Sequence, residues 1–441
     1  MNFIELRVST PLLNALEDLE FVYPTPIQEK CFRRITSGKD VVGIAQTGTG
    51  KTFAYLLPLL DQLEYSTQKH PRVIIIVPTR ELVVQVKEEI EKLARYKNVR
   101  IKAVFGGANI NTQKEYIYDG GADILIGTPG RLYDIAVTGI LRLNNIKKVV
   151  IDEVDEMLTL GFRSQIEQLL AMMPQKRQNL MFSATLSHEV DNFIEEYFQS
   201  PEKIIIDDRS TPVEKISQKI YFVPNLNTKI EFLKQLLKDE EVFNKTLVFV
   251  SGKKQADYVF DKLSPEFGDS VGVMHSNKSQ NLRFNTIKSF EKGKIKTLIA
   301  TDVVAKGLDF TDVSYVINLT PPEDMFDYIH RIGRTGRANK EGNSILMISP
   351  YEEDIYREIL KIAGNNVHEE KLPESVIISK ILLEEEKPSS SQRNIIKNPD
   401  ITKSGGAFHE KSEKRLKTNS GGLKKKAKSK TSKRSGKIKK K

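Results

Sequence analysis

Short runs of aliphatic and β-branched residues recur along the chain, and each is too short for an ordinary helix. In the first half they lie at residues 41–44, 73–77, 124–126, 149–151 and 180–182. Between them are stretches with helical periodicity, such as residues 81–95. Strands that alternate with helices of this length indicate βαβ units and a parallel sheet covered on both faces.

The same pattern starts again after a polar segment at residues 207–215, which we interpret as a linker. The second set of apolar runs lies at residues 219–223, 247–250, 271–274, 297–299, 315–318 and 345–348. We therefore predict an α/β protein with two tandem parallel-sheet domains, the second ending near residue 370. Residues 371–386 are expected to pack on that domain as a short helix.

Charge is distributed unevenly along the 441 residues. The net charge of the chain is +10, but residues 387–441 hold 19 Lys and Arg against 3 Asp and Glu. The preceding 386 residues therefore carry a net charge of −6. The last 55 residues are rich in Ser, Gly, Asn and Lys and contain one aromatic residue, Phe408, so we expect a disordered basic tail.

The cysteine content and the apolar runs indicate the compartment. Cys31 is the only cysteine, which excludes an internal disulfide and a cysteine-based zinc site and suits a reducing compartment. No run of apolar residues is long enough for a membrane span, and no secretory signal is evident at the N-terminus. We expect a soluble, cytoplasmic protein without membrane contact.

Residues 45–52 read AQTGTGKT, between a predicted strand and a predicted helix, which is the context of a phosphate-binding loop. Glycines let backbone amides approach phosphate oxygens, and the helix N-terminus adds partial positive charge. Ala45 departs from the glycine of the general pattern, and a glycine-rich turn without a ligand is the alternative. The predicted nucleotide-binding residues are Ala45, Gln46, Thr47, Gly48, Thr49, Gly50, Lys51 and Thr52.

A second predicted strand ends in the sequence DEVD at residues 152–155. The carboxyl end of a parallel strand is where such sheets bind ligands. We expect Asp152 and Thr52 to hold Mg²⁺, largely through water, and Glu153 to polarise the attacking water while Lys51 contacts phosphate. Alone, this segment is compatible with a solvated acidic loop, but together with AQTGTGKT it indicates a nucleotide site.

Further short motifs follow in a fixed order: PTPIQ at residues 24–28, PTREL at 78–82, TPGR at 128–131, SAT at 183–185 and HRIGRTGR at 330–337. Over about residues 1–370, their order and spacing resemble the DEAD-box RNA helicases of superfamily 2. The resemblance implies two RecA-like domains that use ATP and Mg²⁺ and bind RNA. The predicted division is a Q-motif region at 1–29, a first domain at 30–206, a linker at 207–215, a second domain at 216–370, an extension at 371–386 and the tail at 387–441.

The resemblance assigns further residues to the nucleotide. Gln28 of the Q motif would read the adenine edge, since an amide donates and accepts at once. Phe3 would stack on the base, with core packing as an equal alternative. Gly307 and Asp309 would lie towards the nucleotide. Arg334 and Arg337 would act as arginine fingers, and His330 would link the γ-phosphate region to neighbouring motifs, although HRIGRTGR alone is compatible with a basic loop.

The resemblance also assigns an RNA path across both domains, chiefly to phosphates and without reading sequence. Its members are cations, small residues and hydroxyls that suit a single strand: Arg80, Gly106, Gly107, Thr128, Gly130, Arg131, Arg283, Thr301 and Asp302. Three further residues, Asp155, Ser183 and Thr185, would couple ATP hydrolysis to strand separation through a contact between SAT and DEVD.

Four positions depart from the family pattern. Val154 replaces Ala in the DEAD sequence, and we expect some crowding beneath that loop. Lys306 replaces an arginine, which exchanges a forked donor for a point charge. Glu20 and Ser276 each replace a glycine. None of these changes removes a predicted catalytic group, so we expect an active enzyme.

The function that we predict is an RNA-stimulated ATPase that locally unwinds RNA duplexes or remodels ribonucleoproteins. The alternatives are an ATP-locked RNA clamp, a DNA-directed superfamily 2 motor and an unrelated P-loop ATPase. We expect a monomer whose tail adds nonspecific RNA affinity, with a solubilising or nuclear-targeting tail as the alternative. Ribosome assembly, mRNA decay and the cold response are all compatible with this prediction.

Overall fold

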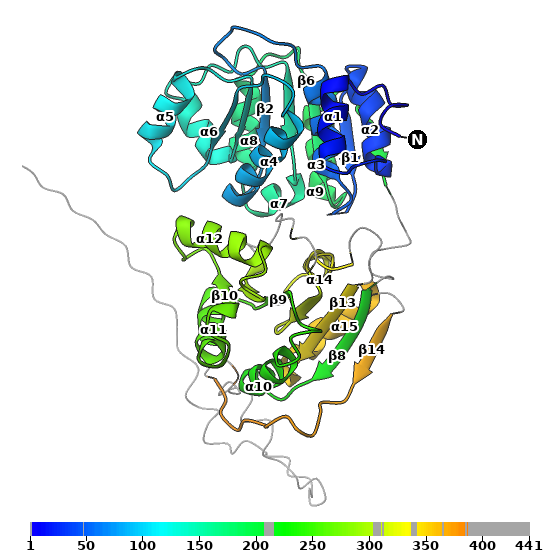
Figure 1. The fold of residues 1–441 in the computed structure, drawn as a ribbon, viewed down its shortest axis with the longest axis vertical. Helices are drawn as coiled ribbons and strands as arrows, with labels where there is room; N and C mark the ends of the chain where they lie inside the picture. Colours follow the sequence, from blue (N-terminus) through cyan, green and yellow to red (C-terminus); the bar gives the residue numbers. More distant parts are fainter. Residues whose placement is uncertain are drawn as a thin grey trace, which may run out of the picture. The chain divides into compact units, whose positions relative to one another are not determined.

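The structure is a computed structural model that describes residues 2–46, 48–206, 216–302, 310, 313–336, 342–363, 366–383 and 386. Residues 2–206 form one α/β domain and residues 216–370 form another (Figure 1). Both belong to one compact unit, Met1–Glu386. The predicted linker and the predicted tail lie outside the described residues.

The first domain is built on a parallel sheet with the strand order β3-β4-β2-β5-β6-β1-β7. Neighbouring strands are in parallel register throughout, for example Val41 beside Leu180 and Val73 beside Lys148. The strands are β1 (Val41–Ile44), β2 (Val73–Ile76), β3 (Ile101–Val104), β4 (Ile124–Gly127), β5 (Lys148–Ile151), β6 (Gln178–Ser183) and β7 (Glu202–Ile205).

Helices cover both faces of this sheet because successive strand side chains point to opposite sides. Ile75 and Leu180 join a core with α1 to α4, whereas Ile74 and Met181 join a core with α6 to α9. The helices are α1 (Thr10–Asp18), α2 (Pro26–Thr36), α3 (Lys51–Asp61), α4 (Arg80–Leu93), α5 (Ile110–Tyr118), α6 (Pro129–Ala136), α7 (Val154–Thr159), α8 (Arg163–Ala171) and α9 (His188–Tyr197).

The second domain repeats this architecture, with the strand order β10-β11-β9-β12-β13-β8-β14. Its sheet is also parallel. The strands are β8 (Ile216–Phe222), β9 (Thr246–Phe249), β10 (Val271–Met274), β11 (Thr297–Ala300), β12 (Tyr315–Asn318), β13 (Gly342–Ile348) and β14 (Val367–Glu370). The predicted fold class of two tandem parallel α/β domains is thereby confirmed.

The helices of the second domain again lie on both faces. Val248 and Ile317 pack with α10 and α11, whereas Leu247 and Phe249 pack with α12. The helices are α10 (Leu226–Leu237), α11 (Lys253–Phe267), α12 (Gln280–Glu291), α14 (Met325–Ile332) and α15 (Glu353–Ile362), with 3-10 turns η2 (Gly268–Ser270) and η3 (Pro350–Glu352). No helix among the described residues is long and apolar enough to cross a membrane.

All of the strands predicted from apolar runs are present, with ends shifted by at most three residues. Three further strands, β3, β7 and β14, were not predicted. All three lie at sheet edges: β3 beside β4, β7 beside β1 and β14 beside β8. Their sequences, IKAV, EKII and VHEE, carry charged side chains that an edge position leaves partly exposed. They therefore lack the continuous apolar run of a central strand.

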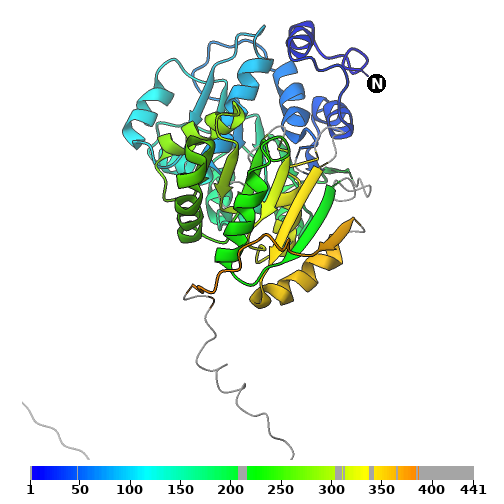
Figure 2. The same cartoon turned by 60° about the horizontal axis from the view of Figure 1, so that its bottom comes forward.

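The segment after β14 packs on the second domain, as predicted, but the prediction that it is helical is wrong. Residues 371–383 contain turns and extended chain (orange in Figures 1 and 2). Val376 is buried in the core beside α10 and α11. Side chains of α10 hold its backbone: Asn225 Nδ2 donates to Ser379 O over 2.7 Å. Pro373 and the β-branched residues 376–378 disfavour a helix here.

The turn after α1 contains a residue in a left-handed conformation. Glu20 has φ 59°, with its amide bonded to Glu17 O, and the amide of Phe21 is bonded to Leu16 O. These two bonds define a Schellman motif, whose left-handed position strongly favours glycine. The replacement of glycine by Glu20 therefore introduces backbone strain immediately before the Q motif.

We predict that Glu20→Gly stabilises the first domain by about 0.5–1 kcal/mol, because it relieves the left-handed strain at an exposed position. Scanning calorimetry of the full chain would show a higher melting temperature. Glu17→Gly is the matched control: it lies in the last turn of α1 and should lower stability by about 0.5–1 kcal/mol. An unchanged or lower melting temperature for Glu20→Gly would contradict the strain argument.

Candidate active site

The loop between β1 and α3 has the geometry of a phosphate cradle. Gly48 and Gly50 have φ values of 81° and 88°, which residues other than glycine rarely adopt. Gly50 is the N-cap of α3 and Lys51 is its first residue, so unpaired backbone amides of the helix point into the loop. Thr49 Oγ1 donates to Gln46 O over 2.7 Å and closes the turn. Thr47 lies outside the described residues.

Gln28 connects the Q motif to this loop. Its Oε1 accepts from the backbone amide of Thr25 over 3.0 Å, and its Nε2 donates to Gly50 O over 3.2 Å. A side chain at Gly50 would collide with the Gln28 amide. The two segments are therefore fixed to each other by one side chain, whose role towards adenine stays a prediction.

Two aromatic residues at the N-terminal end of the first domain differ in exposure. Phe3 is 4% exposed and belongs to the core of the first domain, so its packing alternative is realised in this structure. Phe21 is 48% exposed and rests edge-on against Phe53 of α3, with ring centroids 5.3 Å apart. No role was predicted for Phe21, although it stands three residues before PTPIQ.

The end of β5 places two carboxylates beside Lys51. Lys51 Nζ is 3.0 Å from Glu153 Oε2, and both side chains are largely buried. Asp152 is 4% exposed, and its two oxygens accept different bonds. Oδ1 accepts from the backbone amide of Glu153 over 3.0 Å, and Oδ2 accepts from the Tyr55 hydroxyl over 2.9 Å. Glu153 itself has φ 51°, a left-handed conformation, and as the N-cap of α7 it sets the direction in which that helix begins.

These contacts set the charges of the site. Burial raises the pKa of Asp152 to about 7, and the charge of Glu153 adds to that rise. Burial lowers the pKa of Lys51, but Glu153 and two further carboxylates more than compensate, so that this pKa is raised. Burial also raises the pKa of Tyr55 well above its usual value, so its hydroxyl remains a donor. The ammonium of Lys51 is therefore held charged among carboxylates.

The predicted contact between SAT and DEVD is present. Asp155 Oδ2 accepts from the amide of Thr185 over 3.1 Å and from its hydroxyl over 2.9 Å. Ser183 Oγ donates to Thr185 O over 2.7 Å. Val154 is fully buried beneath the loop in the core of that face. These bonds join the end of β6 to the first turn of α7, whereas coupling to RNA stays a prediction.

In the second domain, the turn after α14 carries Arg334, the first of the two predicted fingers. Arg334 is 3% exposed, and its Nε donates to His330 O over 3.2 Å. Burial lowers the pKa of Arg334, and the opposing influence comes from Glu153 and Glu156 of the first domain. His330 Nδ1 is 3.8 Å from Asp327 Oδ1. Arg337, Gly307 and Asp309 lie outside the described residues, and so does Lys306.

Arg331, for which no role was predicted, is a buried and extensively bonded side chain of α14. It is 2% exposed and donates to both carboxylate oxygens of Asp302, over 2.6 and 2.7 Å. It also donates to Asn318 Oδ1 and Thr320 O, and its guanidinium lies 5.0 Å from the Phe249 ring centroid. Asp302, predicted to face RNA, is thus bonded within the domain through both oxygens.

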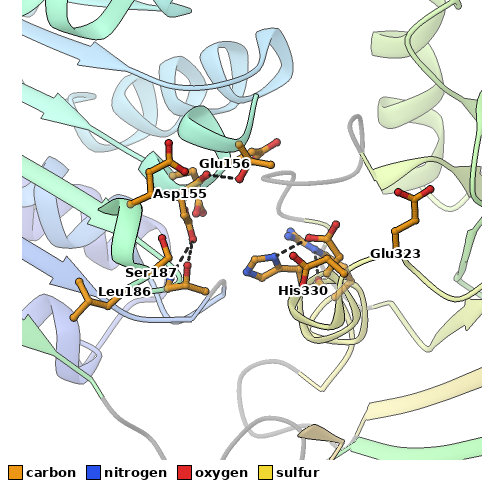
Figure 3. A pocket seen from close by; sticks show the side chains of 13 residues that line it. Asp155, Glu156, Leu186, Ser187, Glu323 and His330 are labelled. Atoms are coloured by element: carbon orange, nitrogen blue, oxygen red, sulfur yellow. Dashed lines mark hydrogen bonds and ion pairs between the residues drawn. The ribbon is translucent and has the colours of Figure 1, made fainter. Parts of the chain in front are cut away.

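A cavity of about 410 Å³ joins the two sets of residues (Figure 3). The first domain lines it with Glu153, Asp155 and Thr185. The second domain contributes His330 and Arg334. The DEVD loop and the first of the two predicted fingers therefore face one space.

The predicted RNA residues of the two domains also meet. Arg80 Nη1 donates to Gln280 Oε1 over 2.9 Å, and Gln280 Nε2 donates to Glu81 Oε1 over 3.3 Å. Glu81, 4% exposed, pairs with Arg283. Phe105 and Phe284 add an edge-on ring contact. We call Arg80, Glu81, Gln280 and Arg283 the bridging cluster, because the first two belong to PTREL in the first domain and the last two to the sequence QNLR at residues 280–283 in the second.

The remaining predicted RNA residues follow the ends of β3 and β4 in the first domain and of β11 in the second. Arg131 donates to Gln113 Oε1 over 2.8 Å and to Ala108 O over 3.0 Å. Thr128 is the N-cap of α6, and the space beside the Gly130 Cα is open. A side chain at Gly107 would collide with the Arg80 guanidinium, while Gly106 lies farther from it. Thr301 follows β11 and is 7% exposed.

Known families match both domains. The DEAD/DEAH box helicase family matches residues 25–193, and the helicase conserved C-terminal domain matches residues 228–339. The ATP-dependent RNA helicase RhlB of Shewanella woodyi is 37% identical over 351 residues, which is 78% of this chain and 79% of that protein. This chain belongs to the DEAD/DEAH box helicase family.

Other members of the family resemble the chain over the same region. The DEAD-box ATP-dependent RNA helicase CshA of Bacillus cereus is 38% identical over 350 residues, 79% of this chain and 66% of that relative. The chain thus spans slightly less than two thirds of this longer relative. The structure of S. cerevisiae Dbp5 bound to RNA and ADP BeF3 has a TM-score of 0.76 at 28% identity, covering 84% of this chain and 95% of Dbp5. Mss116p bound to ssRNA and AMP-PNP gives 0.75 at 29% identity, covering 83% and 78%.

The matched regions of this DEAD/DEAH box protein include the phosphate loop, the DEVD loop and α14. Arg331 and two of its hydrogen-bond partners, Asp302 and Asn318, all lie within the matched residues 228–339. Arg331 stands next to His330 in HRIGRTGR, so its place in the motif was a signal for a role. Its partners are distant in sequence, and the motif alone did not indicate them.

We predict that Arg331→Met destabilises the second domain by about 3 kcal/mol, because it leaves the Asp302 carboxylate without its bidentate partner. Thermal unfolding of the full chain would measure the loss. Adding Asp302→Leu to Arg331→Met should recover part of it. The control Arg357→Met removes an arginine that is 70% exposed on α15 and should change stability by less than about 0.5 kcal/mol. Equal losses for the two single variants would contradict the assigned role.

Proposed function

We propose that the protein is an ATP-dependent RNA helicase, in which RNA stimulates the reaction of ATP and water to ADP and phosphate. The observation that carries this proposal is the shared cavity, where the DEVD loop of one domain faces Arg334 of the other. Neither domain alone has both the phosphate cradle and an arginine finger. Turnover would therefore depend on the domains being together, and RNA is the proposed ligand that holds them so.

The residues present fit a Mg²⁺–triphosphate. Gly48 and Gly50 hold the loop open for phosphate oxygens, and Lys51 supplies a charged ammonium at the same helix end. Asp152 and Thr52 offer oxygen ligands, which Mg²⁺ prefers, and it usually keeps several waters beside one or two carboxylates. When bound, the ion would neutralise charge that develops on the phosphate oxygens.

Glu153 is the proposed base that orients the attacking water, and it is engaged by Lys51 in this structure. The ammonium of Lys51 pairs with Glu153 in this structure. A bound triphosphate would compete for that ammonium, so nucleotide binding would release the Glu153 carboxylate. Arg334 would then bring positive charge to the transferring phosphate, where arginine fingers act. The bond of Asp155 to Thr185 would fix the far end of the DEVD loop during this step.

RNA is proposed to lie across the bridging cluster. Arg80 and Arg283 belong to different domains, and each lies in that cluster. Burial lowers the pKa of each guanidinium, yet both remain cations at any physiological pH and suit phosphate contacts. Arg131, Gly107 and Thr301 would extend the path. We also propose that Gln28, with Phe21 rather than Phe3 beside it, receives the adenine.

Several finer features belong to this proposal. Buried Cys31 suits a cytoplasmic location, in keeping with a reducing compartment. We propose a monomer that acts on ribonucleoprotein or ribosomal assemblies. The basic residues 387–441 would add nonspecific affinity for RNA phosphates.

We predict that Lys51→Ala, Glu153→Gln and Arg334→Ala each lower RNA-stimulated ATP turnover at least 100-fold, for different reasons. Lys51→Ala should lose triphosphate binding, and Arg334→Ala should bind but not react. Glu153→Gln should bind ATP and RNA and accumulate the closed complex, in which both ligands hold the two domains together. Steady-state phosphate release and RNA retention in the presence of ATP are the two measurements.

Glu189→Gln is the control, because Glu189 lines the same cavity but lies outside the DEVD loop. It should keep turnover within about twofold of the unchanged protein. If Glu153→Gln fails to retain RNA with ATP, the proposed closure is wrong. An unchanged protein that hydrolyses about one ATP per bound RNA, and then stays bound, would instead identify an ATP-locked clamp.

We predict that deleting residues 387–441 raises the RNA concentration for half-maximal ATPase about tenfold at low salt, with the maximal rate nearly unchanged. The deletion removes 19 basic side chains but none of the described site residues. Replacing the 11 Lys and Arg of residues 424–441 with Gln should reproduce much of the effect. The same RNA dependence with and without the tail at low salt would show that it is not an RNA-binding element.

A further inference from the structure

Tyr55 is a buried side chain beside the nucleotide site to which neither the motifs nor the proposed mechanism assigns a role. It lies on α3, one helical turn after Lys51, and it is fully buried. Its hydroxyl donates to Asp152 Oδ2 over 2.9 Å. A buried hydroxyl is unfavourable unless it is hydrogen-bonded, and a phenylalanine could fill nearly the same space. The function of this hydroxyl therefore has to be sought at Asp152.

The ring of Tyr55 is held by packing against the sheet. Its centroid is 5.1 Å from that of Phe182 on β6, with the rings tilted by 50°. Phe182 in turn fills the space above Gly43 of β1, where any side chain would collide with the Phe182 ring. Strands β1 and β6 thus determine where the hydroxyl of Tyr55 points.

The carboxylate of Asp152 is oriented from two sides. The backbone amide of Glu153 fixes Oδ1, and the Tyr55 hydroxyl fixes Oδ2. Each carboxylate oxygen has more than one acceptor site, so both can still accept from a water or contact a cation. The amide bond belongs to the DEVD loop itself. The Tyr55 bond comes from α3, which also carries Thr52, three residues earlier in the same helix.

We propose that Tyr55 is a positioning residue that holds Asp152 in register with Thr52, so that both present oxygen to one Mg²⁺ ion. This inference rests on the proposed function and deepens it. α3 begins in the phosphate loop and β5 ends in the DEVD loop. The Tyr55 hydroxyl is the link between them that reaches the metal-ligating carboxylate. Removing a hydrogen bond from a neighbouring side chain to a metal ligand commonly lowers the metal affinity by about 10–100-fold.

The test is Tyr55→Phe, which keeps the ring and removes only the hydroxyl. Binding of a fluorescent ATP analogue is titrated first in EDTA and then with increasing Mg²⁺. We expect the affinity in EDTA to stay within about twofold of the unchanged protein. The Mg²⁺ concentration for half-maximal enhancement of binding should rise about tenfold.

Tyr356→Phe is the matched control, since Tyr356 is also buried and its hydroxyl also donates to a carboxylate, that of Glu369 in the second domain. It should leave the Mg²⁺ titration unchanged. The double variant Tyr55→Phe with Asp152→Asn should match Asp152→Asn alone, because a residue that acts through Asp152 has no effect without it.

A lower melting temperature of Tyr55→Phe with an unchanged Mg²⁺ titration would overturn the inference and leave a purely structural hydrogen bond. So would additive effects of Tyr55→Phe and Asp152→Asn. Failure of the proposed function would look different. In that case the unchanged protein would show no Mg²⁺-dependent binding of the ATP analogue at all.

Discussion

The nucleotide site depends on the burial of charge at the carboxyl ends of β1 and β5. Lys51, Asp152 and Glu153 lie almost out of water, and isolated charges in that position would be strongly unfavourable. They are tolerated because each has a partner of opposite charge or a hydrogen-bond donor. Removing one member of such a set commonly costs more than the pair contributes, since its partner stays buried. The loops are therefore held in place by the same groups that we propose do the chemistry.

The bridging cluster extends this principle to the boundary between the domains. Glu81 is a buried carboxylate of the first domain, and Arg283 of the second domain is its cation. Gln280 is bonded to Arg80 and Glu81 at once, so it connects the two adjacent side chains of PTREL. Side chains that suit RNA phosphates therefore bond to each other across the boundary between the two domains. A strand placed there would compete with these bonds while bringing its own negative charge.

Much of the fold was readable from the sequence, since central strands such as β2 and β9 are continuous apolar runs. The edge strand β14, with the sequence VHEE, has no such signal because three of its four side chains are exposed. The motifs placed the DEVD loop and the phosphate loop correctly relative to strand ends and helix starts. They did not indicate Arg331 or Tyr55, because the partners of these residues, Asp302 and Asp152, are 29 and 97 positions away. Contacts of that kind arise from packing and leave no local pattern.

The bond from Gln28 to Gly50 has a consequence for how the enzyme distinguishes one nucleotide from another. The side chain proposed to recognise the base is attached to the turn that cradles the phosphates. Base recognition would then alter the conformation of the phosphate loop as well as the affinity for the nucleotide. A nucleotide with the wrong base could bind through its phosphates and still sit in a misaligned cradle. Discrimination would appear in kcat as well as in KM, which makes the Q motif a checkpoint on catalysis.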